Sequence, residues 1–194
     1  MVILDAMEKA AGVRVLQAEL NDQPGVCLKL TGALADAGAA AEAAASLARG
    51  MGVSVVARTL PNPSNDSKRA YAPAPDFNSL IEQASIHRPR EMKGPNGENM
   101  SEQAGFAIGL IETQGFAAVI EAIDTALKTA AVEVLAREKL GGGYITVVIK
   151  GDVAAVRAAV EAGSARVNGL GKLIAAHVIS SPSTAVLALL PATT

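Results

Sequence analysis

Apolar and polar residues alternate along some stretches of the chain and recur at helical spacing along others. One face of a helix predicted over residues 116–130 carries four apolar side chains: Ala117, Ile120, Ile123 and Leu127. Residues 132–138 alternate between apolar and polar, which predicts a strand with one buried face. Residues 144–150 are almost wholly apolar and rich in β-branched side chains, which predicts a strand buried on both faces.

The flanking segments extend this pattern into a complete domain. Residues 107–111 read as a short buried strand, and residues 139–143 as a flexible loop. Gly151-Asp152 turns into a helix that runs through Ala165, with Asp152 as its N-cap. Residues 173–180 form a last strand, and residues 184–190 a short helix. The order strand–helix–strand–strand–helix–strand predicts an α+β domain, a mainly antiparallel sheet flanked by helices.

The chain also repeats itself at an offset of 119 residues. Residues 1–64 align with 120–183 without a gap, and 18 of the 64 pairs are identical. Six of these pairs are Ala on Ala, which an Ala-rich chain produces easily, but Asp5 falls on Asp124 and Lys9 on Lys128. We therefore expect two similar units of fewer than 100 residues each.

The first half copies the second from the middle of its first helix onward. Its expected elements are the helix end Leu4–Ala11, the strands Val13–Glu19 and Val26–Leu30, the helix Ala33–Arg49 and the last strand Val53–Leu60. Residues 105–119, with the opening strand, have no copy. Either the sequence starts late, or another segment covers that position in the sheet.

Between the halves lies a polar segment rich in proline, which predicts an extended connection with a short helix near Phe77–Ala84. The expected organisation is a first domain over 1–64, a linker over 65–103 and a second domain over 104–194.

Composition narrows the function. Half of the residues are hydrophobic but only 3% are aromatic, so the core must consist of small aliphatic side chains. The net charge is −2 and no basic stripe is visible, which argues against nucleic acid as a binding partner. The single cysteine excludes an internal disulfide and fits a reducing cytosol. Met1 to Leu4 is too short for a signal peptide, and no apolar stretch reaches the ~18 residues that a membrane span needs. We expect a cytoplasmic protein.

Several motifs of the second half resemble those of a known family, the bacterial microcompartment shell proteins. The motifs are the opening strand at 107–116, the helix end at 126–132, the loop at 139–143, the strand and helix start at 148–156 and the last strand at 177–179 followed by Pro182. The resemblance covers about 105–190, and the first half joins it mostly through the internal alignment. The whole chain resembles a shell protein with two tandem ferredoxin-like domains.

This resemblance implies a structural protein without catalytic activity. Three chains would form a homotrimer, a pseudohexameric tile that packs edge to edge with other shell proteins. A central pore would pass metabolites, and the enclosed enzymes are further candidate partners. The protein would lie in the microcompartment shell within the cytoplasm.

The resemblance also assigns residues. The pore would be lined by one loop from each half: Asn21, Asp22, Gln23 and Pro24, and Gly141, Gly142 and Gly143. Glycines would present backbone groups to the opening, and Asp22 would disfavour anions. The alternative is that both loops are ordinary hairpin turns.

The tile edge would be formed by Lys9 and Lys128, with Asn62 and Ser181 at a position where the family often has arginine. The alternative for each lysine is a solvated side chain at a helix C-terminus.

No cofactor is expected. Cys27 reads as a buried structural thiol, although some tandem shell proteins hold an iron–sulfur cluster on a pore-loop cysteine. His87 and His177 lack neighbours at metal-ligand spacing, and no nucleophile–base pair stands out. Two other functions remain open: a small-molecule-binding regulatory protein of α+β fold, and an enzyme with a cleft between the halves.

Overall fold

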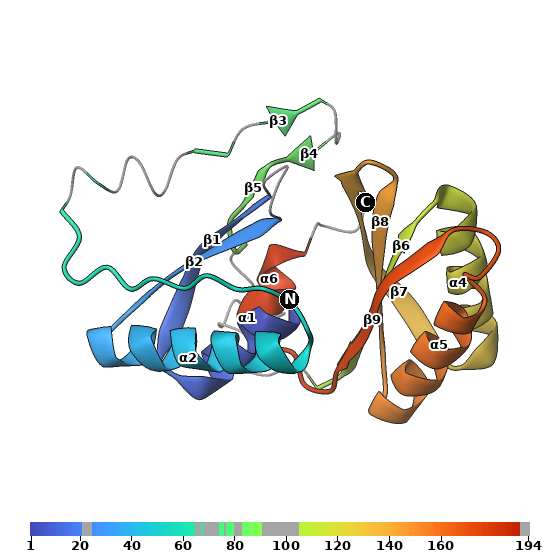
Figure 1. Cartoon of the computed structure of the whole chain (residues 1–194). Helices are drawn as coiled ribbons and strands as arrows, with labels where there is room; N and C mark the ends of the chain where they lie inside the picture. Colours follow the sequence, from blue (N-terminus) through green and yellow to red (C-terminus); the bar gives the residue numbers. More distant parts are fainter. Residues whose placement is uncertain are drawn as a thin grey trace. The chain divides into compact units, whose positions relative to one another are not determined.

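The computed structural model describes residues 1–20, 25–64, 67, 74–75, 77–79, 83–90 and 105–190 (Figure 1). The chain forms two compact units, which we describe one at a time. Unit 1 comprises Met1–Phe77, Ala84–Met100 and Ser183–Leu189, and unit 2 comprises Asn78–Gln83, Ser101–Pro182 and Leu190–Thr194. The α+β fold class with two repeated domains is confirmed.

Unit 2 is a four-stranded antiparallel sheet with two helices. Its strands lie in the order β7-β8-β6-β9. Their bounds are β6 Ala107–Gln114, β7 Val132–Gly141, β8 Tyr144–Gly151 and β9 Lys172–Ile179, and the helices are α4 Phe116–Thr129 and α5 Val153–Ala165. Both helices pack on the central strand β6, so the middle of the sheet is buried.

The core of unit 2 is built from small aliphatic side chains, as the composition predicts. Ile111, Val119, Ile149 and Val156 are at most 1% exposed. Where α4 and α5 meet, a Cβ added at Gly163 would lie 2.6 Å from a backbone oxygen of α4. Only glycine allows this close approach of the two helices.

Unit 1 contains the copied elements and two segments from elsewhere in the chain. The elements are α1 Val2–Ala10, β1 Val13–Leu20, β2 Val26–Gly32, α2 Leu34–Gly50, β5 Ile86–His87 and α6 Thr184–Leu189. Its sheet has the order β2-β1-β5, so β2 is an edge strand. The helix α6 packs against α1 and β1 although it comes from the far end of the chain.

The internal repeat is present in the strand register. Val13 pairs with Gly32, and at +119 Val132 pairs with Gly151. The offset also holds at the register shift, which falls at Val15/Gln17 in unit 1 and at its copy Val134/Ala136 in unit 2. The described paired parts of the two hairpins, from Val13 to Leu20 and from Val132 to Lys139, therefore share one register.

Three local predictions are wrong. Val53–Leu60 is not a strand. Its copy in unit 2 is β9, which pairs with β6, and the described part of unit 1 has no counterpart of β6. The helix near Phe77–Ala84 is replaced by two short paired strands, β3 Phe77–Asn78 and β4 Gln83–Ala84. The loop at 139–143 is mostly strand, because β7 continues to Gly141 and pairs with β8 up to the turn.

The predicted domain ranges 1–64, 65–103 and 104–194 stay a prediction. The compact units group Ser183–Leu189 with the N-terminal half. Most of the predicted linker lies outside the described residues.

Candidate functional site

The predicted pore glycines form the tip of the β7–β8 hairpin. Gly141, Gly142 and Gly143 all have positive φ, at 80°, 58° and 81°. Two central residues with positive φ give the turn that matches the twist of a tight hairpin, and glycine adopts it without steric cost. Gly142 and Gly143 are exposed, so this tip presents backbone rather than side chains to its surroundings.

Two hydrogen bonds fix this tip to the rest of unit 2. The Gly115 N–H donates to the Gly143 carbonyl at 3.0 Å. The Gln114 Nε2 donates to the Gly142 carbonyl at 3.3 Å. The turn is thus held at both residues by the junction of β6 and α4. The corresponding residues of unit 1, Asn21, Asp22, Gln23 and Pro24, lie outside the described residues.

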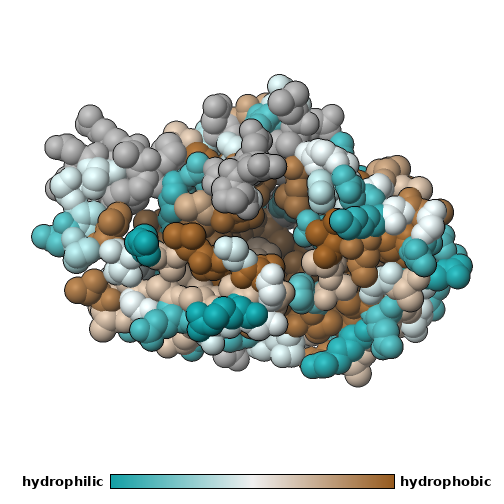
Figure 2. All heavy atoms as spheres, viewed as in Figure 1, coloured by the Kyte–Doolittle hydropathy of each residue, from teal (hydrophilic) through white to brown (hydrophobic). Residues whose placement is uncertain are grey.

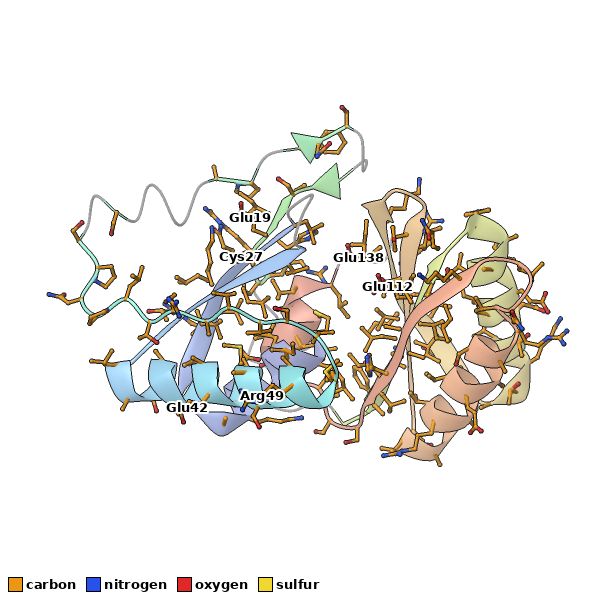
Figure 3. The ribbon with its side chains drawn as sticks, in the orientation of Figure 1. Glu19, Cys27, Glu42, Arg49, Glu112 and Glu138 are labelled. Carbon is orange, nitrogen blue, oxygen red and sulfur yellow. The ribbon has the colours of Figure 1, made fainter. Side chains whose placement is uncertain are left out.

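A row of polar side chains crosses the sheet of unit 2 a few residues before the hairpin tip. Glu138 in β7 pairs with Thr146 in β8, which pairs with Glu112 in β6. Burial raises the pKa of the Glu112 carboxyl above its ordinary value. Figure 3 labels Glu112 and Glu138.

Unit 1 carries the same row in altered form. Glu19 stands at the copy of Glu138 and pairs with Cys27, which replaces Thr146. Lys29 Nζ lies 2.6 Å from Glu19 Oε2 and neutralises that carboxylate. Cys27 is only half-buried, contrary to the prediction of a buried thiol, because it lies on the edge strand β2.

The two predicted edge lysines form equivalent ion pairs. Lys9 Nζ lies 2.6 Å from Asp5 Oδ2, and Lys128 Nζ lies 2.5 Å from Asp124 Oδ2, each one helical turn apart. The Asp124 carboxylate raises the pKa of Lys128 by its hydrogen bond and its charge. The surroundings differ, since 74% of the Lys128 side chain is exposed against 39% of Lys9.

Asp5 is more buried than its copy Asp124, because the segment that begins α6 covers it. Its Oδ1 accepts a hydrogen bond of 2.9 Å from the Ser183 N–H. The Ser183 hydroxyl donates to Glu8 and accepts from the Val186 N–H at 3.3 Å, which caps α6. Burial raises the pKa of Glu8 above its ordinary value, against the lowering effect of the Ser183 hydrogen bond.

The two remaining predicted edge residues lie at equivalent places in the repeat. Ser181 follows β9 by two residues. Asn62 follows the segment 53–60 and is exposed, with a positive φ of 48°. Asparagine tolerates this conformation better than most residues. The edge role of both residues stays a prediction.

Sequence reasoning missed four residues of the site. They are the lysines' partners Asp5 and Asp124, the half-buried Glu112, and Ser183. The four-residue Asp–Lys spacing, repeated in both halves, was the available signal for the ion pairs. Burial of Glu112 and docking of Ser183 on α1 depend on tertiary contacts.

The part of the chain that the structure describes holds neither a cluster of potential metal ligands nor a helix that could span a membrane. No cluster of three His, Cys, Asp or Glu side chains there could hold a metal ion. Among the same residues, every helix is too short or too polar to cross a bilayer. His177 lies in β9 and His87 in β5.

The fold and hairpins define a class of protein, a tandem α+β chain with a repeated domain. The BMC domain family matches residues 1–63 and 107–182, which is more than half of the chain. The chain therefore belongs to the BMC-domain family of bacterial microcompartment shell proteins and carries the domain twice.

Three comparisons illustrate the similarity. The bacterial microcompartment shell protein PduA of Citrobacter freundii is 46% identical over 85 residues, which are 44% of this chain and 91% of PduA. The carboxysome shell protein CsoS1 of Prochlorococcus marinus (strain MIT 9313) is 47% identical over 83 residues, 42% of this chain and 81% of that protein. A microcompartment protein of known structure from Desulfitobacterium hafniense DCB is 29% identical, with 93% and 87% of the two chains covered and a TM-score of 0.37.

Proposed function

We propose that three copies of this chain assemble into a pseudohexameric tile of a microcompartment facet, without making or breaking covalent bonds. The observation that carries the proposal is the double domain. The 85 aligned residues of this chain cover 91% of PduA, which corresponds to one domain. This chain holds the domain twice, and the paired strands of the two hairpins have the same register. Three chains then supply six hairpins, and a closed ring satisfies all equivalent contacts.

The exposed Gly142–Gly143 tip supports the proposal of a pore. A tip without side chains would leave an opening wide and line it with backbone groups rather than side chains. The Gly142 and Gly143 carbonyls already accept hydrogen bonds from Gln114 and Gly115, so a solute would meet only their second lone pairs. The turn is fixed by hydrogen bonds from Gln114 and Gly115, and it would give the opening a defined diameter. The loop at 21–24, with Asp22, stays a prediction for the alternating positions.

The exposed pair Lys128–Asp124 supports the proposal of an edge contact. The ion pair holds the lysine in one orientation, and the high exposure leaves it able to pack against a neighbouring tile. An exposed pair of this kind adds little to the stability of the monomer. Its replacement should therefore affect assembly more than folding.

Two measurements test the proposal. Light scattering on the purified protein should give the mass of three chains, and electron microscopy of concentrated protein should show sheets or tubes of hexagonal outline. Lys128→Ala should keep the trimer and lose the sheets. A monomeric protein at high concentration would refute the tile, and unchanged sheets in the variant would refute the edge role.

The pore has its own test. Gly142→Asp introduces a residue type that tolerates positive φ and would add a carboxylate to the tip at each copy. In assembled shells, it should slow the entry of an anionic metabolite while the trimer mass stays unchanged. Equal entry rates for the variant and the native protein would place the tip away from the transport path.

A further inference from the structure

The internal repeat supplies both halves of a second contact like the one between α1 and the segment that begins α6. In unit 1 the Ser183 N–H donates to Asp5 Oδ1 at 2.9 Å. At the offset of 119, the copies of these residues are Ser64 and Asp124. Ser64 is exposed, and the Asp124 side chain is 52% exposed against 10% for Asp5. Among the described residues, neither the Ser64 N–H nor Asp124 Oδ1 has a hydrogen-bond partner, so one chain carries an unused donor and an unused acceptor.

The face of α4 that contains Asp124 is open, whereas the same face of α1 is covered. Ile120, Asp124 and Leu127 recur at helical spacing, and all three are exposed. Their copies in α1 are buried or half-buried, and they are Met1, Asp5 and Glu8. Figure 2, viewed as in Figure 1, shows a mixture of hydrophilic and apolar surface over α4 and α5. The open face of α4 therefore corresponds to the surface of α1 against which α6 packs.

The segment around Ser64 has the same local geometry as the segment around Ser183. Ser64 Oγ accepts a hydrogen bond of 3.3 Å from the Ser67 N–H. Ser183 Oγ accepts one of 3.3 Å from the Val186 N–H, and Ser67 and Val186 are copies at the same offset. A proline precedes the serine in both segments. A segment that already has the conformation of the bound one loses little conformational entropy when it binds.

We propose that the Pro63-Ser64 segment of one copy of this chain binds α4 of a second copy, with the Ser64 N–H donating to Asp124 Oδ1. Asp124 Oδ2 stays paired with Lys128, as Asp5 Oδ2 is paired with Lys9 in unit 1. An unused donor and an unused acceptor at different places of one molecule give a head-to-tail contact, which closes into a ring through further copies. This inference rests on the proposed trimer and names a contact that closes it.

The contact between copies has fewer supporting groups than the contact within unit 1. The Ser183 hydroxyl donates to Glu8, whereas the residue that would face the Ser64 side chain is Leu127, the copy of Glu8. The buried apolar residues of α6 are also replaced, since the copy of Leu187 is Lys68. The hydrogen bond to the Asp124 carboxylate therefore supplies a larger share of the affinity between copies, and its removal should be measurable as dissociation.

Proline and alanine at position 64 separate the backbone donor from the side chain. Ser64→Pro removes the N–H, whereas Ser64→Ala keeps it and is the matched control. In sedimentation runs over a dilution series of the full chain, Ser64→Pro should raise the concentration at which the trimer half-dissociates about tenfold or more, and Ser64→Ala less than about threefold. Asp124→Ala should match Ser64→Pro. The double variant should be no weaker than either single variant, because both remove the same bond.

A cross-link identifies the chain that supplies the serine. One chain carries Ser64→Cys, which keeps the backbone donor, and another carries Leu127→Cys, both with Cys27→Ser to remove the native thiol. The co-assembled chains should react with a short bis-maleimide to a product with the mass of two chains. In the matched control, Arg157→Cys on the exposed side of α5 takes the place of Leu127→Cys and should give no such product.

Three results would overturn this contact and leave the trimer standing. Equal dissociation of the Ser64→Pro and Ser64→Ala trimers would show that the N–H is not used. Additive effects of Ser64→Pro and Asp124→Ala would show that the two groups do not bind each other. A cross-link within one chain that carries both Ser64→Cys and Leu127→Cys, with none between mixed chains, would place the contact inside the chain. A native protein that stays monomeric at high concentration would instead refute the trimer together with this contact.

Discussion

Replacing Gln17 by methionine should stabilise unit 1. Gln17 lies in β1 and is fully buried, and among the described residues neither its Nε2 nor its Oε1 has a hydrogen-bond partner. Its copy in unit 2 is Ala136, which is 5% exposed. The repeat thus places an amide in unit 1 where unit 2 has an apolar side chain.

The magnitude follows from the cost of burying polar atoms. A buried donor or acceptor without a partner costs about 1–3 kcal/mol. Methionine is unbranched and of similar volume, and a swap of this kind in a core costs less than about 1.5 kcal/mol. We expect Gln17→Met to raise the free energy of unfolding by about 1–2 kcal/mol. For a chain of this size, that corresponds to a Tm increase of roughly 2–8 °C.

Denaturant unfolding followed by circular dichroism measures the change, and hydrogen exchange of the β1 amides assigns it to unit 1. The matched control is Gln114→Met. The Gln114 amide has a partner, the Gly142 carbonyl, so its loss should not stabilise the protein. A Gln17→Met variant no more stable than the native chain would show that the amide is satisfied in solution, and would refute the reasoning.

Three further predictions follow from the geometry. Burial raises the pKa of the Glu112 carboxyl above its ordinary value of 4.5. The protonated carboxyl therefore stabilises the folded state fully below pH 4.5, and this stabilisation is lost as the pH rises through the raised pKa. Glu112→Gln should remove the corresponding fall in Tm with rising pH. Gly163→Ala places a Cβ 2.6 Å from the Ala122 carbonyl and should lower unfolding stability by about 1–2 kcal/mol in denaturant melts, despite the better helix propensity of alanine. Asp5→Ala breaks a buried hydrogen bond from Ser183 and a part-buried ion pair with Lys9, and it should cost about 2–4 kcal/mol, whereas Asp124→Ala should cost under about 0.5 kcal/mol. Equal effects in denaturant melts would contradict the difference in burial.

The elements of unit 2 could be predicted closely because their signals are local. The helix predicted over 116–130 ends within one residue of α4, and the apolar run 144–150 is β8 but for one residue. The predicted N-cap at Asp152 is confirmed, although its side chain makes no capping hydrogen bond. Pattern and turn residues carry most of the information for the bounds of such elements. They do not give the buried face of α4, where Ala118, Val119, Ala122 and Ala126 are buried, whereas Ile120 and Leu127 of the predicted apolar face are 50% and 42% exposed.

Val53–Leu60 shows where local pattern fails. The segment and β9 are copies at the same offset, yet only β9 is a strand. A strand exists through its neighbours, and β9 has β6 beside it. The repeat predicts a strand at 53–60 only for a unit that contains a copy of β6. The internal alignment pairs no residue of the given sequence with β6, and this explains why the strand prediction fails.

The candidate site divides in the same way. The hairpin glycines and the lysines follow from sequence, because turn chemistry and helix ends are local. The burial of Asp5 by Ser183 does not, since the two residues are 178 positions apart. The buried amide of Gln17 likewise needs the packing of unit 1 to be known.

The two Asp–Lys pairs show what duplication changes at a repeated position. Asp124–Lys128 lies exposed on α4, whereas Asp5–Lys9 is bound into unit 1 through the backbone of Ser183. A contact that needs the lysine to reorient would cost more at Lys9, because its carboxylate partner is shared with α6. If both lysines lie at tile edges, the edges formed by the two units are therefore inequivalent. Lys128→Ala should then impair sheet formation more than Lys9→Ala does, and equal defects by electron microscopy would refute this inequivalence.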